Sequence, residues 1–154
     1  MKVGIVADTH DNMDVIGAAV DCFEGRAAVV VHCGDIVAPF AADFQFYAVR
    51  GNNDGEPALG NTVREFGAYL GEMGKLSFEG TFFAVYHGTS QPLVDALVDC
   101  GNFDYVLHGH THERAVRSLP GATALQAVTV YRDREAGECH EGDDREGPAD
   151  DDRR

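Results

Sequence analysis

Short apolar runs alternate with an amphipathic stretch over the first third of the chain. Residues 12–23 place apolar side chains at helical spacing, with Asp11 or Asn12 as the candidate N-cap. Three apolar runs end abruptly in polar residues, a pattern typical of buried strands; they are 1–7, 27–32 and 46–49. The alternation of strand and helix predicts a largely parallel α/β sheet.

The pattern changes after residue 58, where apolar runs shorten and glycines are frequent. The dipeptides Glu79-Gly80 and Pro120-Gly121 separate pairs of apolar runs and predict antiparallel pairs, the second of them in a second sheet. The predicted helices are 59–67 and 91–98, with a helical turn near 39–44. The predicted strands are 76–78, 81–86, 105–107, 115–119 and 124–131.

Acidic side chains outnumber basic ones, and the 154 residues carry a formal charge of −14. Residues 132–154 hold 10 acidic and 5 basic side chains, so we expect one domain over 1–140 and an acidic tail without stable structure over 141–154. Residues 1–131 still carry a charge of −9. We hypothesise a surface adapted to a high-salt cytoplasm, with an ordinary acidic mesophilic protein as the alternative.

The same charge excludes one class of partner. A protein that binds nucleic acid through many phosphate contacts needs a basic surface, so no stable nucleic-acid binding is expected. No apolar run reaches the length of a membrane span, and no signal-peptide pattern opens the sequence. We therefore expect a cytoplasmic protein without a membrane partner.

Side chains able to bind metal follow five of the predicted strands, beside glycines. Because ligands bind beyond the carboxyl ends of strands in open α/β sheets, we expect these side chains to converge. Carboxylate, amide and imidazole groups suit Mn²⁺, Fe²⁺, Mg²⁺, Co²⁺, Ni²⁺ or Zn²⁺, and seven of them favour two ions that share a carboxylate. The set is Asp8, His10, Asp35, Asn52, His87, His110 and His112.

Five short motifs, D-x-H, G-D, G-N-x-D, H-G and G-H-x-H, occur in that order. With them the chain resembles the calcineurin-like metallophosphoesterases over residues 1–131, and most of all their small archaeal and bacterial phosphodiesterases. The resemblance implies a two-sheet α/β sandwich, with mixed sheets flanked by helices. It also implies a phosphodiesterase that hydrolyses a P–O ester with a hydroxide bridging two divalent ions, Mn²⁺ first among them.

The resemblance also assigns roles to the ligands. One ion would be held by Asp8, His10, Asp35 and His112. The other would be held by Asp35, Asn52, His87 and His110, with Asp35 as the bridge. The catalytic candidates are Asp35, Asn52 and His87, together with Asn53, which stands where larger relatives carry a histidine that protonates the leaving group. An amide cannot serve as an acid near neutral pH.

The loss of that histidine leaves the proton donor open. Asp54, His32, His108 or water would replace it, or the enzyme would prefer good leaving groups. By position, Asp54 is interpreted as bracing its loop and His32 as a hydrogen-bonded support behind the site. Arg50 is interpreted as a substrate contact or a surface ion pair. The Asn-Pro-Gly-Ser turn that often follows the last histidine motif in the family is missing.

Two other functions are compatible with the same features. A phosphomonoesterase or nucleotide pyrophosphatase would use the same ligands with a different pocket, whereas a non-catalytic protein like the retromer scaffold subunit would share only the fold. The retained ligands favour an enzyme. We expect a small phosphodiester or nucleotide-like substrate, selected by loops near 39–44, 56–60 and 89–92, and a homodimer or tetramer is compatible with the resemblance.

Overall fold

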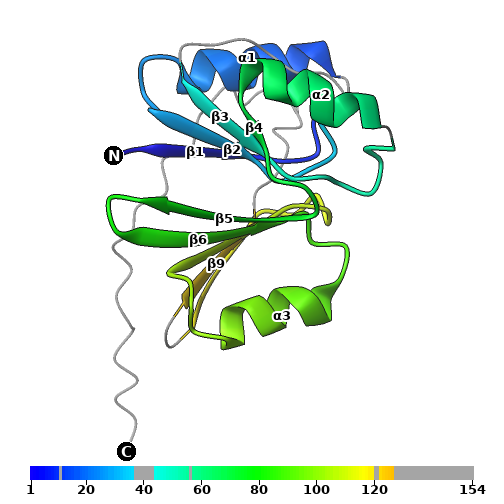
Figure 1. Ribbon diagram of the computed structural model, residues 1–154. Coiled ribbons are helices and arrows are strands. Elements are labelled where there is room, and N and C mark those ends of the chain that lie inside the picture. The colour runs from blue at the N-terminus through cyan, green and yellow to red at the C-terminus, as the bar shows by residue number, and fades with distance from the viewer. Residues whose placement is uncertain (11, 37–43, 56, 120–121, 127–154) are drawn as a thin grey trace, which may run out of the picture.

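Two β-sheets lie face to face in this computed structural model, with helices on their outer faces (Figure 1). The structure describes residues 1–10, 12–36, 44–55, 57–119 and 122–126. The first sheet is parallel throughout its described strands and has the order β1-β2-β3-β4. Its strands are β1 (Val3–Val6), β2 (Val29–His32), β3 (Gln45–Ala48) and β4 (Ala68–Tyr69).

The second sheet is mixed and has the order β5-β6-β7-β9-β8. Strands β5 and β6 pair antiparallel, as do β8 and β9, whereas β7 is parallel to both of its neighbours. Its strands are β5 (Met73–Phe78), β6 (Thr81–Tyr86), β7 (Tyr105–His108), β8 (Ala115–Leu119) and β9 (Ala122–Gln126). The predicted two-sheet α/β sandwich with flanking helices is thus confirmed, and among the described strands the mixed sheet is the second one.

Three helices in the described part of the chain cover the outer faces of the two sheets. Figure 1 shows α1 (Met13–Phe23) and α2 (Pro57–Phe66) over the first sheet, and α3 (Gln91–Asp99) on the far side of the second. Each helix contributes an apolar stripe to the core, as amphipathic helices on a sheet do. None of the described helices is long and apolar enough to cross a membrane.

Strand β2 shows how the layers are joined, because its alternate side chains enter different cores. Val30 packs in the cluster that includes Ile16 of α1 and Val63 of α2. Val29 and Val31 pack in the cluster between the sheets, with residues of β6 and β7. A strand buried on both faces has no solvent side, which explains its uninterrupted apolar sequence.

Most predicted elements are present, with shifted ends. Asn12 caps α1, where its side-chain oxygen accepts from the backbone N–H of Val15 at 3.2 Å. Glu79 and Gly80 have φ of 50° and 84° in the β5–β6 hairpin, as its tight turn requires. Strand β4 was not predicted. The predicted N-cap Asp11, the turn near 39–44, Pro120-Gly121, residues 127–131 and the tail lie outside the described residues, so the domain boundary stays a prediction.

Candidate metal centre

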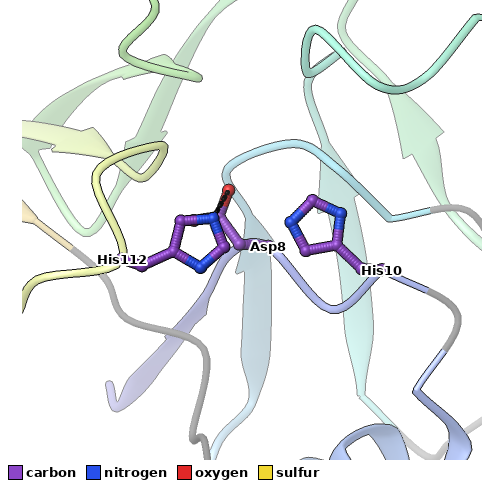
Figure 2. Close-up of side chains that lie close together, drawn as sticks. All are labelled: Asp8, His10 and His112. Carbon is purple, nitrogen blue, oxygen red and sulfur yellow. Dashed lines mark ion pairs between the residues drawn. The ribbon is translucent and has the colours of Figure 1, made fainter.

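Loops from both sheets bring the predicted ligands to one place. Asp8 follows β1, Asp35 follows β2 and His87 follows β6, and all three side chains are buried. Their ligand atoms lie within 4.8 Å of one another, which is close enough to hold one metal ion. A second such group joins Asp8 to His10 and His112, whose side chains are more open to solvent (Figure 2). Both groups share Asp8.

In the solvent-side group, His10 and His112 reach Asp8 from two different loops (Figure 2). Their rings are parallel to within 3°, with centroids 5.3 Å apart. His112 Nε2 lies 4.0 Å from Asp8 Oδ1, and His10 Nε2 lies 3.7 Å from Asp35 Oδ2. Ligands about 2.1 Å from a common metal lie roughly 3–3.5 Å apart, so small side-chain adjustments suffice to bind one.

His87 is oriented by contacts at both ring nitrogens. Its Nδ1 lies 2.8 Å from the carbonyl oxygen of Cys33, an acceptor, so Nδ1 carries the proton and donates. Nε2 faces the site, 2.9 Å from Asn52 Oδ1 and 3.5 Å from Asp35 Oδ2. A ring N–H bonded to a backbone carbonyl is the usual arrangement behind a metal-binding histidine, because it fixes the tautomer that ligates.

His110 and Asn52 complete the set at its edge. The backbone N–H of His110 donates to Asp8 Oδ2 at 2.9 Å, and its ring meets that of His87 edge-on at 5.1 Å. His110 belongs to neither ligand group, and Asn52 joins the site through its contact with His87. All seven predicted ligands therefore meet, but Asp8 rather than Asp35 is common to both groups. Which residue holds which ion stays a prediction.

Five of the seven ligands have a left-handed backbone. The φ angles are 57° for Asp8, 44° for His10, 57° for Asp35, 79° for His110 and 58° for His112. Asp and His enter this region more readily than most residues, yet each still costs about 1 kcal/mol or more. Strain of this kind persists where the surroundings enforce it, and it gathers at functional sites. The left-handed backbone changes the chain direction just after each strand, so that these side chains can point towards one another.

Asp54 braces the loops that carry Asp35, as predicted. Its Oδ2 accepts from the backbone N–H of Asp35 and of Gly51, both at 2.8 Å, and its Oδ1 accepts from that of Ile36 at 2.9 Å. Gly51 lies so close that a Cβ there would overlap the Asp35 carboxylate. Only glycine lets the loop after β3 approach the loop after β2 this far.

Asn53 has a role that the sequence analysis did not assign to it. Its backbone N–H donates to Asp35 Oδ1 at 2.8 Å and its side-chain amide donates to Asp35 Oδ2 at 2.7 Å. The residue at the position of the family's acid histidine therefore holds the Asp35 carboxylate instead of offering a proton. The sequence carries a weak signal, since an amide can donate two hydrogen bonds to a carboxylate.

His32 ties the loops behind the site together and is confirmed as a support. Its Nδ1 accepts from the N–H of Gly34 at 3.2 Å, so Nε2 carries the proton and donates to Thr9 Oγ1 at 3.1 Å. The Thr9 hydroxyl in turn donates to the carbonyl of Ile36 at 3.0 Å. Burial, with a smaller effect of His87, lowers the pKa of His32 to about 3. Both nitrogens are engaged in the neutral form.

Cys33 and His108 lie beside the site, and both side chains are buried. Burial, followed by the charge of Asp8, raises the pKa of the Cys33 thiol. The residue contributes to the site through its backbone carbonyl, which accepts the hydrogen bond from His87. Burial also lowers the pKa of His108, the last residue of β7. Neither residue belongs to the ligand groups among the described residues.

The donor set fits divalent metal ions. Two buried carboxylates stand next to imidazoles and an amide, with no thiolate in either ligand group. Burying two carboxylates side by side is costly unless a cation offsets their charge. Carboxylate and imidazole ligands in this mixture suit Mn²⁺, Fe²⁺, Co²⁺ and Zn²⁺, and do not by themselves select one of them.

Comparison with known proteins identifies the family. The model of the calcineurin-like phosphoesterase superfamily domain matches residues 1–137. A phosphodiesterase of Methanocaldococcus jannaschii is 32% identical over 129 residues, which cover 77% of this chain and 78% of that protein.

Solved structures agree in fold. An archaeal phosphodiesterase superposes with a TM-score of 0.73 at 29% identity, covering 82% of each chain. Vacuolar protein sorting 29 of Cryptosporidium parvum superposes with a TM-score of 0.58 at 15% identity, over 82% of this chain and 73% of that one. At this identity the similarity shows a common fold and no common function. The expected hydrolase acting on phosphoric esters is confirmed, and the chain belongs to the calcineurin-like phosphoesterase superfamily.

Proposed function

We propose that this protein is a phosphodiesterase that cleaves a P–O ester of a small substrate with two divalent metal ions at the candidate metal centre. The observation that carries the proposal is the pair of ligand groups that share Asp8. Two neighbouring groups of this kind match a two-metal site, which clamps the attacking and leaving oxygens of a displacement at phosphorus. The relatives named as phosphodiesterases support a diester over a monoester.

We assign the ligands as the resemblance implies, with Asp35 as the carboxylate that would contact both ions, because its Oδ2 lies 3.7 Å from His10 Nε2 and 3.5 Å from His87 Nε2. Mn²⁺ is the first candidate metal. When bound, the ions supply Lewis-acid activation of water and of the phosphoryl group. The chain's own part is to hold the ligands still. Asn53 fixes both oxygens of Asp35, and the Cys33 carbonyl fixes the ring of His87.

Two candidate proton donors are ruled out by their hydrogen bonds. Asp54 accepts backbone N–H groups at both oxygens, as an ionised carboxylate does. His32 is fully buried and uses both ring nitrogens. With Asn53 holding Asp35, no acid stands in place of the family's histidine among these three residues. His108 and water stay as candidate proton donors, and where water takes this part we propose a preference for substrates with good leaving groups.

The test is hydrolysis of bis-p-nitrophenyl phosphate and of p-nitrophenyl phosphate, with and without Mn²⁺, together with the metal content of the purified protein. We expect turnover of the diester that requires metal. The Asp35→Asn variant should lose about 100-fold or more of this activity and part of its bound metal, because a neutral amide binds divalent ions more weakly. The control is Asp99→Asn, an exposed position at the end of α3.

Each result leads to a different conclusion. Turnover of the monoester alone would overturn the diesterase assignment, and full activity in Asp35→Asn would overturn the two-metal arrangement. No turnover of either ester and no bound metal would favour a non-catalytic protein that shares the fold of vacuolar protein sorting 29.

A further inference from the structure

A small hollow opens beside the metal centre, where the loops of the two sheets meet. Its volume is about 180 Å³. That is room for roughly six water molecules, and less than the space usually needed for a drug-sized ligand. Six of its lining residues are Arg50, Asn52, Glu72, Tyr86, His87 and Thr89. Asn52 and His87 also belong to the metal centre, so a substrate bound there would extend into this hollow.

The walls of the hollow are polar but carry no net charge. Arg50 Nη1 and Glu72 Oε1 form an ion pair at 2.9 Å, which confirms the surface ion pair, one of the two interpretations of Arg50. Arg50 is also held by its own loop, since its Nε donates to the backbone carbonyl of Asp54 at 3.0 Å. Glu72 is the looser partner, with 73% of its side chain exposed. The pair neutralises Arg50, the only cationic side chain among the described residues that line the hollow.

A pair of hydroxyl groups also lines the hollow. Tyr86, the buried last residue of β6, and the exposed Thr89 share a hydrogen bond of 2.7 Å between their oxygens. Only one of the two hydrogens is used in that bond, so the other hydrogen and several lone pairs stay available to a ligand. These groups suit an alcohol or a sugar hydroxyl.

We infer that the hollow is the subsite for one ester substituent of the substrate, and that it takes an uncharged, hydroxyl-bearing group of the size of one sugar or glycerol unit. Thr89 binds this group through its hydroxyl, and Glu72 disfavours substituents that carry a second phosphate. This inference rests on the proposed function, because it concerns the same site. It favours sugar or glycerol phosphodiesters over substrates with a further phosphate at this position.

The role of Glu72 follows from charge. A second phosphate entering the hollow would meet the Glu72 carboxylate at the rim, and Arg50 is already paired with it. Exposed ion pairs contribute only about 0.2–1 kcal/mol, so the selection by this one residue is modest, at most about fivefold. Neutralising Glu72 would free Arg50 to bind an anion while its bond to Asp54 keeps it in place.

The test uses three matched substrates: the p-nitrophenyl ester of thymidine 5′-phosphate, the same ester with a 3′-phosphate, and the same ester without the 3′-hydroxyl. We measure kcat/KM in Mn²⁺ for the wild type, Glu72→Gln, Thr89→Val and the control Glu65→Gln, an exposed residue of α2. Thermal unfolding of each variant checks that it folds.

The wild type should prefer the 3′-hydroxyl substrate to both of the others. Glu72→Gln should raise kcat/KM for the 3′-phosphate substrate about three- to fivefold relative to the 3′-hydroxyl substrate, and Glu65→Gln should not. Thr89→Val should lower kcat/KM for the 3′-hydroxyl substrate about fivefold and leave the 3′-deoxy substrate within twofold.

The failures are distinguishable. Hydrolysis by the wild type with substrate ratios unchanged in Glu72→Gln and Thr89→Val would overturn the subsite and leave the phosphodiesterase in place. A wild-type preference for the 3′-phosphate substrate would also overturn the subsite. Metal-loaded protein that hydrolyses none of the three esters or bis-p-nitrophenyl phosphate would overturn the proposed function itself.

Discussion

Asp35 is held by several hydrogen bonds in the candidate metal centre. Its carboxylate accepts from Asn53 at both oxygens, and its own backbone N–H donates to Asp54. Its left-handed φ of 57° is therefore enforced by neighbours on a different loop. A ligand fixed in this way loses little conformational entropy when a metal binds, because its side chain is already ordered in the folded protein.

Replacing Asp54 tests whether this support matters. In Asp54→Asn one oxygen becomes an NH₂ group that faces a backbone N–H, so at least one of three buried N–H groups loses its acceptor. We expect a loss of about 2 kcal/mol in unfolding free energy and a 10- to 100-fold weaker affinity for Mn²⁺. Urea unfolding in chelator and a Mn²⁺ titration measure the two effects.

The exposed Asp21→Asn on α1 is the matched control and should change neither quantity. Normal Mn²⁺ affinity in a folded Asp54→Asn variant would show that the ligands do not depend on this brace. A loss of stability alone would confine Asp54 to a structural role.

Between elements, His32 at the end of β2 connects the loops after β1 and β2 through Thr9 and Gly34. Burial keeps it neutral, with a pKa of about 3 in the fold against 6.5 for a free histidine. The unfolded chain therefore binds one more proton between these values. Stability from this residue is complete above pH 6.5 and falls as the pH drops towards 3, by about 1.4 kcal/mol per pH unit.

The measurement is urea unfolding between about pH 7 and pH 5 in chelator, so that metal binding adds no pH dependence. Wild type should lose about 2 kcal/mol more than His32→Gln over this range, because glutamine keeps a donor and an acceptor but does not titrate. All other titrating groups are shared by the two proteins, so they cancel in the difference. Equal losses would show that the fold does not lower the pKa of His32.

The elements that the sequence predicts are those with a strong local pattern. Helix α1 follows from its apolar spacing and the cap at Asn12, and strand β2 follows from its apolar run. Strand β4, by contrast, has two residues and exists only because Ala68 and Tyr69 pair with β3. Helix α2 begins at Pro57, two residues before the predicted start, since proline is favoured in a first turn.

The metal centre can likewise be predicted from the sequence only in part. Motifs at strand ends predict which side chains converge, because parallel strands end at a common edge and carry their following loops there. The sequence does not predict that Asp8 is shared by the two ligand groups, or that Asn53 donates hydrogen bonds to Asp35. Both features depend on contacts between loops distant in sequence. Nor does it predict the left-handed φ of the ligands, which tertiary contacts impose.

At the scale of the whole molecule, an acidic chain is proposed to bind an anionic substrate. The formal charge of −14 opposes phosphate everywhere on the surface except where cations gather. The two sheets confine the predicted ligands to one edge, and metal ions there would reverse the local charge. A small substrate held at one point is therefore compatible with this charge, whereas a long polyanion in contact with the wider surface is not.

The same charge predicts how the molecule responds to salt. Repulsion among acidic side chains destabilises the compact state, and at about 1 M salt the screening length falls to about 3 Å, which removes most of it. If the surface is adapted to a high-salt cytoplasm, the midpoint of thermal unfolding should rise continuously between about 0.05 M and 2 M KCl. Neutralising three exposed acids, in Asp21→Asn/Glu65→Gln/Asp99→Asn, should stabilise the protein at low salt and reduce the rise in the unfolding midpoint.

The same titration in sucrose separates screening of charge from the general effect of an excluded solute, since sucrose carries no ions. A midpoint that is highest at low salt would refute the adaptation, because repulsion would then be too weak to matter at the charge this chain carries.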